Sequence, residues 1–229
     1  MTSNSYNCYK YLYLHGFASG SGSSKGLLLN KFFKEQLQNV ELHLPDLNIP
    51  SFEKLSVSEI VKHLKSEMLN TTQQYRLIGS SLGGLVAATL ASEFKECSKI
   101  QSLILLCPAL DASNRWKAKM TESDLNQWQL DGSKKYYHFS TKTEQQLHYG
   151  FYEDLMKQVQ YPLIDVPITI VHGTTDDIVP INTSRTYIQL LQKNGWNNEL
   201  IEVNDDHLLM KTESIDVIKN VIRKRWFNE

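Results

Sequence analysis

Residues 75–84 read YRLIGSSLGG, and this stretch decides the fold. Residues 75–78 have the apolar character of a short strand, and residues 82–94 are uninterrupted helix formers. Between them, Gly79 and Gly83 flank Ser81 in the pattern G-x-S-x-G, where a glycine has no Cβ to obstruct a tight turn. The stretch therefore predicts a strand, a sharp turn that exposes Ser81, and a helix.

Outward from this turn, apolar runs alternate with helical patterns along the chain. The run from Ile100 to Cys107 is almost continuously apolar, as is typical of a strand covered on both faces. Strand and helix alternation of this kind predicts an α/β fold with a parallel sheet and helices on both faces. The expected strands are 11–14, 40–44, 75–78, 100–107, 168–171 and 200–203, and the expected helices begin near residues 25, 57, 82, 183 and 215.

One segment, residues 111–160, breaks this alternation. It contains no convincing strand, but it is rich in polar helix formers and aromatic residues. We expect a small helical cap of two or three short helices, inserted into a single domain that spans residues 1–229. The aromatic side chains either line an apolar pocket beneath this cap or form a small core within it.

Composition excludes several classes of function. The chain has 229 residues, 41% hydrophobic and 21% charged, with a net charge of −1 and no basic run longer than residues 223–225, so we expect no nucleic-acid partner. Cys8, Cys97 and Cys107 are odd in number and form no C-x-x-C pair, which favours a reducing, cytoplasmic location. No apolar stretch approaches the roughly 20 residues of a membrane span.

The chemistry depends on the residues downstream of Ser81. A serine hydroxyl needs a base within hydrogen-bond reach, and the base needs an orienting acid. Asp176 stands just past the expected strand 168–171, and His207 comes after the expected strand 200–203. Open parallel sheets place their sites at such strand ends, and the order serine, acid, histidine is the one that a strand–serine–helix turn requires. We therefore predict a catalytic set of Ser81, Asp176 and His207, with activity that falls in mild acid.

Each member has alternatives. Ser81 could be only a helix cap. Asp177 is the next candidate for the acid, followed by Asp205 and Asp206. His172 precedes Asp176, so a structural role is favoured for it. The other histidines also precede the acid: His43, His63, His138 and His148.

An acyl-transfer site also needs donors for the oxyanion. One is the backbone N–H of Leu82, helped by the positive end of the following helix. The second is predicted to be the N–H of Phe17, in the loop after the first strand. The alternative is that His15-Gly16-Phe17 is an ordinary turn.

Other site types lack support in the sequence. The glycine- and serine-rich residues 20–26 resemble a phosphate cradle, but Lys25 stands where G-x-G-x-x-G requires glycine, and no P-loop is formed. No H-E-x-x-H motif or cluster of cysteines is present. We expect neither a cofactor nor a metal.

Taken together, these motifs resemble the α/β-hydrolase superfamily, and within it the compact bacterial esterases and thioesterases known from sequence. The resemblance implies a three-layer fold with a helical cap, a short sheet without the first antiparallel strands of larger members, and cofactor-free hydrolysis of a small ester or thioester. Ser80 departs from the larger residue that many esterases have before the nucleophile. The motifs that carry the resemblance are residues 14–17, 79–84, 173–176 with 179–180, and 206–207.

Two other functions stay open. An acyl-CoA thioesterase would favour a basic rim, and Arg115, Lys117 and Lys119 offer a weak one. A non-catalytic protein that binds a ligand on a hydrolase scaffold could keep all three residues of the catalytic set.

Overall fold

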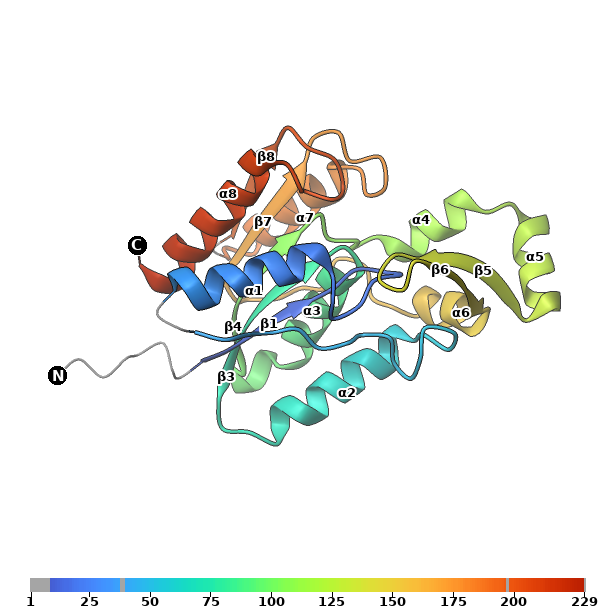
Figure 1. The fold of residues 1–229 in the computed structure, drawn as a ribbon, viewed down its shortest axis with the longest axis horizontal. Helices are drawn as coiled ribbons and strands as arrows, with labels where there is room; N and C mark the ends of the chain where they lie inside the picture. Colours follow the sequence, from blue (N-terminus) through green and yellow to red (C-terminus); the bar gives the residue numbers. More distant parts are fainter. Residues whose placement is uncertain (1–8, 38–39, 197, 229) are drawn as a thin grey trace.

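The computed structural model describes residues 9–37, 40–196 and 198–228; Cys8 lies outside them. Its centre is a sheet of six strands in the order β2-β1-β3-β4-β7-β8, and every neighbouring pair is parallel (Figure 1). The predicted parallel sheet is confirmed. Its strands are β1 (Tyr9–Leu14), β2 (Leu42–His43), β3 (Gln74–Ser80), β4 (Ile100–Leu106), β7 (Ile168–Gly173) and β8 (Asn198–Val203).

Helices cover both faces of the sheet. One core lies between the sheet and α1 (Ser24–Gln36), α8 (Thr212–Ile222) and the π-helical turn η3 (Arg223–Phe227). The other lies between the sheet and α2 (Val57–Leu69), α3 (Leu82–Glu93) and α7 (Asn182–Lys193). A 3₁₀ turn, η2 (Lys95–Cys97), comes after α3.

The strands feed both cores by alternation. In β4, Leu103 and Leu105 enter one core, while Ile104 and Leu106 enter the other. This period of two, with both faces buried, explains why the strand is apolar throughout. Ser23 and Ser56 cap α1 and α2 through hydrogen bonds from Gly26 N–H and Glu59 N–H, respectively.

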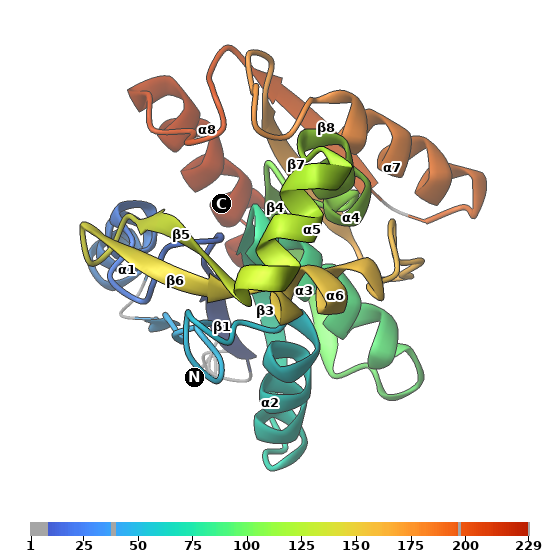
Figure 2. The ribbon, with the colours of Figure 1, turned by 90° about the vertical axis from the view of Figure 1, so that its right-hand side faces the viewer.

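The insertion between β4 and β7 forms a cap, which lies nearest the viewer in Figure 2. It contains three short helices, within the two or three expected, but the prediction that it has no strand is wrong, since β5 and β6 form an antiparallel hairpin. Within these strands only His138 and Leu147 are buried, so the sequence shows no apolar alternation. Its elements are α4 (Ala112–Lys119), α5 (Glu122–Asp131), β5 (Ser133–His138), β6 (Thr143–His148) and α6 (Gly150–Met156).

Main-chain bonds fix this cap to the loops next to it. Phe139 N–H, at the hairpin turn, donates to Ala18 O at 2.8 Å, and Ala18 belongs to the loop after β1. At the other end of the hairpin, His148 N–H donates to Glu53 O at 2.7 Å. The cap therefore lies at the carboxyl end of β1, the edge of the sheet where parallel strands place their sites.

The aromatic residues of the cap form one cluster. Trp128 is buried and donates its indole N–H to Leu147 O at 3.0 Å. The cluster reaches the body of the protein through Phe17, whose ring lies 5.4 Å from that of Trp116 and 5.6 Å from that of Tyr136. Of the two alternatives for these side chains, the packing of the rings favours a small core within the cap, and Phe17 is part of it.

No helix in the described part of the chain has both the length and the apolarity to cross a bilayer.

The tightest approach in the fold joins β1, β3 and α3. A Cβ on Gly83 would lie 2.1 Å from Leu14 O and 2.6 Å from His15 O. A Cβ on Gly79 would lie 2.5 Å from Gly83 O. The atoms that an added Cβ would meet here belong to the backbone, so no side-chain rotation can relieve the clash.

We expect Gly83→Ala to lower the free energy of unfolding by about 3 kcal/mol, because the added methyl group must push α3 away from β1. Urea denaturation measures this loss. Gly22→Ala is the matched control, because no heavy atom lies within 4 Å of its added Cβ, and we expect a change within about 0.5 kcal/mol. Wild-type stability in Gly83→Ala would contradict the close approach.

Candidate active site

Ser81 lies at the turn between β3 and α3 with φ at 53°, a conformation that costs energy for any residue with a side chain. It occupies the position that precedes the helix, but its side chain makes no capping hydrogen bond. Its backbone is held instead, because Ser81 N–H donates to Leu106 O at 2.9 Å and Ser81 O accepts from Ala109 N–H at 3.0 Å. The hydroxyl is left for another partner.

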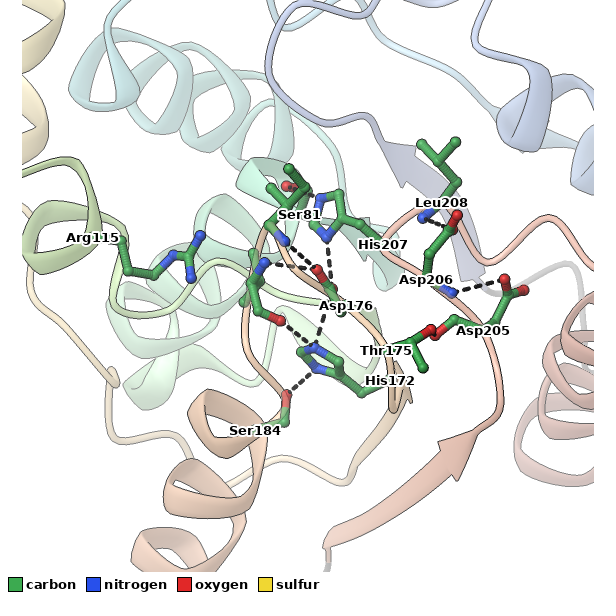
Figure 3. A network of polar contacts seen from close by, with 12 residues as sticks. Ser81, Arg115, His172, Thr175, Asp176, Ser184, Asp205, Asp206, His207 and Leu208 are labelled. Carbon is green, nitrogen blue, oxygen red and sulfur yellow. Dashed lines mark hydrogen bonds and ion pairs between the residues drawn. The ribbon is translucent and has the colours of Figure 1, made fainter. Parts of the chain in front are cut away.

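That partner is His207, as Figure 3 shows. His207 Nε2 lies 2.9 Å from Ser81 Oγ, and His207 Nδ1 lies 2.7 Å from Asp176 Oδ2. The three side chains come from three separate loops, each at the carboxyl end of a strand. The structure thus brings together the three residues that the sequence selects.

Asp176 is held firmly in this arrangement. Its Oδ1 accepts hydrogen bonds from the N–H groups of Ile178, at 2.9 Å, and Val179, at 2.7 Å. Burial alone would raise the pKa of Asp176, but hydrogen bonds from His172, His207 and Val179 outweigh it and hold the pKa far below its usual value. Asp176 is therefore ionised at neutral pH.

The other acids do not contact His207. Asp177 is exposed to solvent. Asp205 is buried but accepts hydrogen bonds from the N–H groups of Asp206 and Lys211, which fixes the loop that carries His207. Asp206 is exposed and accepts from Leu208 N–H.

His172 has a closer relation to the site than the sequence indicates. The side chain of His172 is fully buried. Its Nε2 lies 2.8 Å from Val179 O and 3.2 Å from Asp176 Oδ2, and its Nδ1 lies 2.7 Å from Ser184 Oγ. A neutral ring with its proton on Nε2 satisfies all of these contacts, with the Ser184 hydroxyl donating to Nδ1. His172 thus approaches the same carboxylate oxygen as His207 and helps to hold Asp176 in place.

One group of side chains in the described residues could hold a metal ion: Cys107, His172 and Asp176, whose ligand atoms lie within 4.8 Å of one another. These atoms already serve the site, because Asp176 and His172 are engaged in the contacts above. Burial also raises the pKa of the Cys107 thiol far above its usual value, so the thiolate that a metal requires is disfavoured. These side chains are together because they surround and hold the Asp176 carboxylate.

The loop after β1 lies against Ser81. A Cβ on Gly16 would stand 3.2 Å from Ser81 Cβ, so only glycine fits there without displacement. His15 anchors the loop: its Nε2 accepts from Leu47 N–H at 2.8 Å and its Nδ1 lies 2.9 Å from Gly16 O. Burial lowers the pKa of His15, which favours the neutral ring that these contacts need.

The two backbone donors that the sequence selects for an oxyanion are the N–H groups of Leu82 and Phe17. Leu82 begins α3, where the first N–H groups of a helix have no partner within the helix. Among the described residues, no hydrogen bond from the N–H of Leu82 or of Phe17 is present. Both groups are available to a ligand.

Lys25 is a member of this region that the sequence did not reveal. Its side chain starts in the first turn of α1 and is buried, with 7% of the residue exposed. Burial lowers its pKa to about 8, and the nearby Cys107, Asp205, Asp206 and Asp176 oppose the shift only in part. In the sequence, Lys25 stands in the glycine- and serine-rich stretch 20–26, and nothing there predicts that its side chain is buried.

We expect Lys25→Met to raise the free energy of unfolding at pH 7 and to lose most of that gain by pH 10. The folded pKa of about 8 lies below the unfolded value of 10.5, so the native state bears the cost of a buried charge below pH 8 and is relieved of it as the pH rises toward 10.5. The gain in free energy of unfolding of Lys25→Met over wild type should therefore shrink by about 2 kcal/mol between pH 7 and pH 10, as measured by urea denaturation.

Lys31→Met is the control, since Lys31 is exposed on the same helix. Its effect should be small and independent of pH. A pH-independent effect of Lys25→Met would show that Lys25 keeps an ordinary pKa in the folded protein.

Comparison with known proteins agrees with the architecture. Solved structures with this fold include the α/β-hydrolase domain-containing protein 10 from mouse (18% identity, 94% of this chain and 88% of that one, TM-score 0.73). A monoacylglycerol lipase of Paleococcus ferrophilus is similar (18%, 95% and 93%, TM-score 0.71), as is Est1E of Butyrivibrio proteoclasticus (15%, 98% and 89%, TM-score 0.71). No curated protein sequence matches.

These likenesses confirm the α/β-hydrolase fold that the motifs predicted. A family model covers residues 10–221, which is nearly the whole described chain. The chain therefore belongs to the uncharacterised protein family UPF0227.

Proposed function

We propose that the protein is a serine hydrolase that cleaves carboxylic esters through an acyl-enzyme intermediate. The observation that carries the proposal is the unbroken contact from Ser81 Oγ through His207 to Asp176, at 2.9 and 2.7 Å. A hydroxyl, an imidazole and an ionised carboxylate in this order are what nucleophilic attack on an acyl carbon requires. Several proteins with the same fold are named as esterases or lipases, which agrees with this class.

In the first half of the reaction, Ser81 Oγ attacks the acyl carbon while His207 Nε2 takes its proton. Asp176 holds the proton on His207 Nδ1 and stabilises the imidazolium that forms. The N–H groups of Phe17 and Leu82 receive the oxyanion, each donor contributing roughly 3 kcal/mol. His207 then protonates the departing alcohol.

In the second half, His207 takes a proton from water, which attacks the acyl-enzyme carbon. The same two donors hold the second oxyanion, and the proton on His207 returns to Ser81 as the acid leaves. Every proton moves between groups that are present in the site, so the proposed cycle needs no cofactor or metal.

The aromatic cluster of the cap supports a substrate with an apolar part. Phe17, which carries one proposed oxyanion donor, is in ring contact with Trp116, Tyr136 and Phe151. An acyl group bound at Ser81 would meet these rings at the cap. Thioesters of CoA are less favoured, because Asp111, 3.6 Å from Arg115 on α4, offsets the positive charge of the rim that CoA would need.

Two free thiols lie in the described chain, Cys97 at the surface and Cys107 in the core. Exposed free thiols persist in reducing compartments. We therefore propose a cytoplasmic location.

The test is labelling with a fluorophosphonate, which reacts only with an activated serine. We expect wild type to be labelled and Ser81→Ala to remain unlabelled, because among the described residues only the Ser81 hydroxyl is hydrogen-bonded to His207. Asp176→Asn should reduce labelling and ester hydrolysis by about 10⁴-fold, since the amide favours the wrong tautomer of His207.

Asp177→Asn is the matched control and should retain wild-type rates, since Asp177 is exposed. Folded wild type that takes up no label would contradict the enzyme and favour a protein that only binds its ligand. Label that persists in Ser81→Ala would contradict the nucleophile.

A further inference from the structure

A second polar pair lies beside Ser81, at the start of α4. Ala109 N–H donates to Ser81 O at 3.0 Å, and Asp111 comes two residues later. Arg115 lies one turn further along the helix, and its guanidinium points toward the loops that carry Ser81 and Asp176 (Figure 3). The pair therefore belongs to the part of the cap that borders the candidate site.

The hydrogen-bonding capacity of this pair is largely unused. Arg115 Nε and Asp111 Oδ1 are 3.6 Å apart, which is beyond hydrogen-bond distance, although the two side chains are only 15% and 19% exposed. Asp111 Oδ1 is buried and has no hydrogen-bond partner. Within the described chain, the Arg115 guanidinium makes no hydrogen bond either. Buried polar atoms are usually paired, so Asp111 Oδ1 and the N–H groups of Arg115 are available to a polar group of a ligand.

Tyr161 closes this region on the side of α7. Its φ is 51°, a strained conformation, and its N–H donates to Leu110 O at 3.3 Å. Burial raises the pKa of its hydroxyl, which lies near Asp111, Arg115 and Thr183. The region is thus polar and partly enclosed, and its two charges cancel.

The chemistry of the pair selects its ligand. An anion would be repelled by Asp111, and a cation would be repelled by Arg115. A hydroxyl group matches both, because it donates to the carboxylate oxygen and accepts from the guanidinium. We propose that Asp111 and Arg115 bind a hydroxyl group of the substrate, so that the enzyme prefers esters with a hydroxyl near the scissile bond. The proposal rests on the ester hydrolase activity proposed above.

A site built to hydrogen-bond a hydroxyl discriminates strongly against a methyl group in its place, since the protein groups are then left unpaired. Two pairs of substrates make this replacement. On the alcohol side, 2-hydroxyethyl butyrate is compared with propyl butyrate. On the acyl side, ethyl 3-hydroxybutyrate is compared with ethyl 3-methylbutyrate. We expect kcat/KM to favour the hydroxylated member of one pair by at least about 10-fold.

Variants assign this preference to the two residues. Asp111→Leu and Arg115→Met should bring the ratio within that pair to about 1, while hydrolysis of the methyl member stays near the wild-type rate. A merely structural role would slow both members equally and leave the ratio unchanged. Asp111→Asn is a second, gentler variant, which keeps the shape and should lower the ratio in part. Lys117→Met, on an exposed residue of the same helix, is the control and should keep the wild-type ratio.

The outcomes separate this inference from the activity beneath it. Hydrolysis of all four esters with no preference for a hydroxyl would overturn the inference and leave the hydrolase standing. A preference that survives both substitutions would overturn the assignment to Asp111 and Arg115. Failure of folded wild type to hydrolyse any ester or to take up fluorophosphonate would overturn the proposed function, and the inference with it.

Discussion

The contact on which the rest of the molecule depends is the meeting of three backbone segments around residues 79–84. The end of β1, the end of β3 and the first turn of α3 approach so closely that side chains are excluded at Gly79 and Gly83. This contact leaves Ser81 with a positive φ and directs its hydroxyl away from the helix that it precedes. The same contact sets the loop after β1 directly against the Ser81 side chain. A local packing requirement thus places a reactive group and its neighbours at once.

The sequence predicted those parts of the molecule whose structure is determined by residues close together in the chain. Residues 75–84 carry the strand, the turn and the helix within one short window, and Asp176 and His207 each come after a recognisable apolar strand. Order along the chain then sufficed to select them, because parallel strands bring their carboxyl ends to one edge. The sequence favours Asp176 over Asp177, whereas the contact of Asp176 with His207 is a property of the fold.

Other parts depend on partners that are distant in the chain. In the hairpin of β5 and β6 only His138 and Leu147 are buried, and its turn places Lys142, rather than glycine, at a positive φ, so the sequence predicts neither the strands nor the turn. The lowered pKa of Lys25 and the contact of His172 with Asp176 result from burial in the fold, which the spacing of residues along the chain does not reveal. Asp111 and Arg115 look like an ordinary pair one helical turn apart, and only the unpaired oxygen of Asp111 distinguishes them.

The surroundings of Asp176 show how a carboxylate can be kept charged inside a protein. Two backbone N–H groups hold one oxygen, and two imidazoles approach the other. These contacts compensate for the loss of water, which would otherwise favour the protonated acid. Two of the four contacts come from the loop that carries Asp176, one comes from β7 and one from the loop after β8, so three segments of the chain together hold the acid.

The bond from Phe139 N–H to Ala18 O joins the cap to the loop after β1 and so bears on how a substrate enters the site. Ala18 is the neighbour of Phe17, whose N–H donates to the oxyanion in the proposed reaction, and the hairpin that supplies Phe139 belongs to the cap. A displacement of the hairpin large enough to admit a bulky molecule would break this bond and release the loop beside it. The position of the hairpin and the order of the loop beside Ser81 are thus linked through one main-chain hydrogen bond.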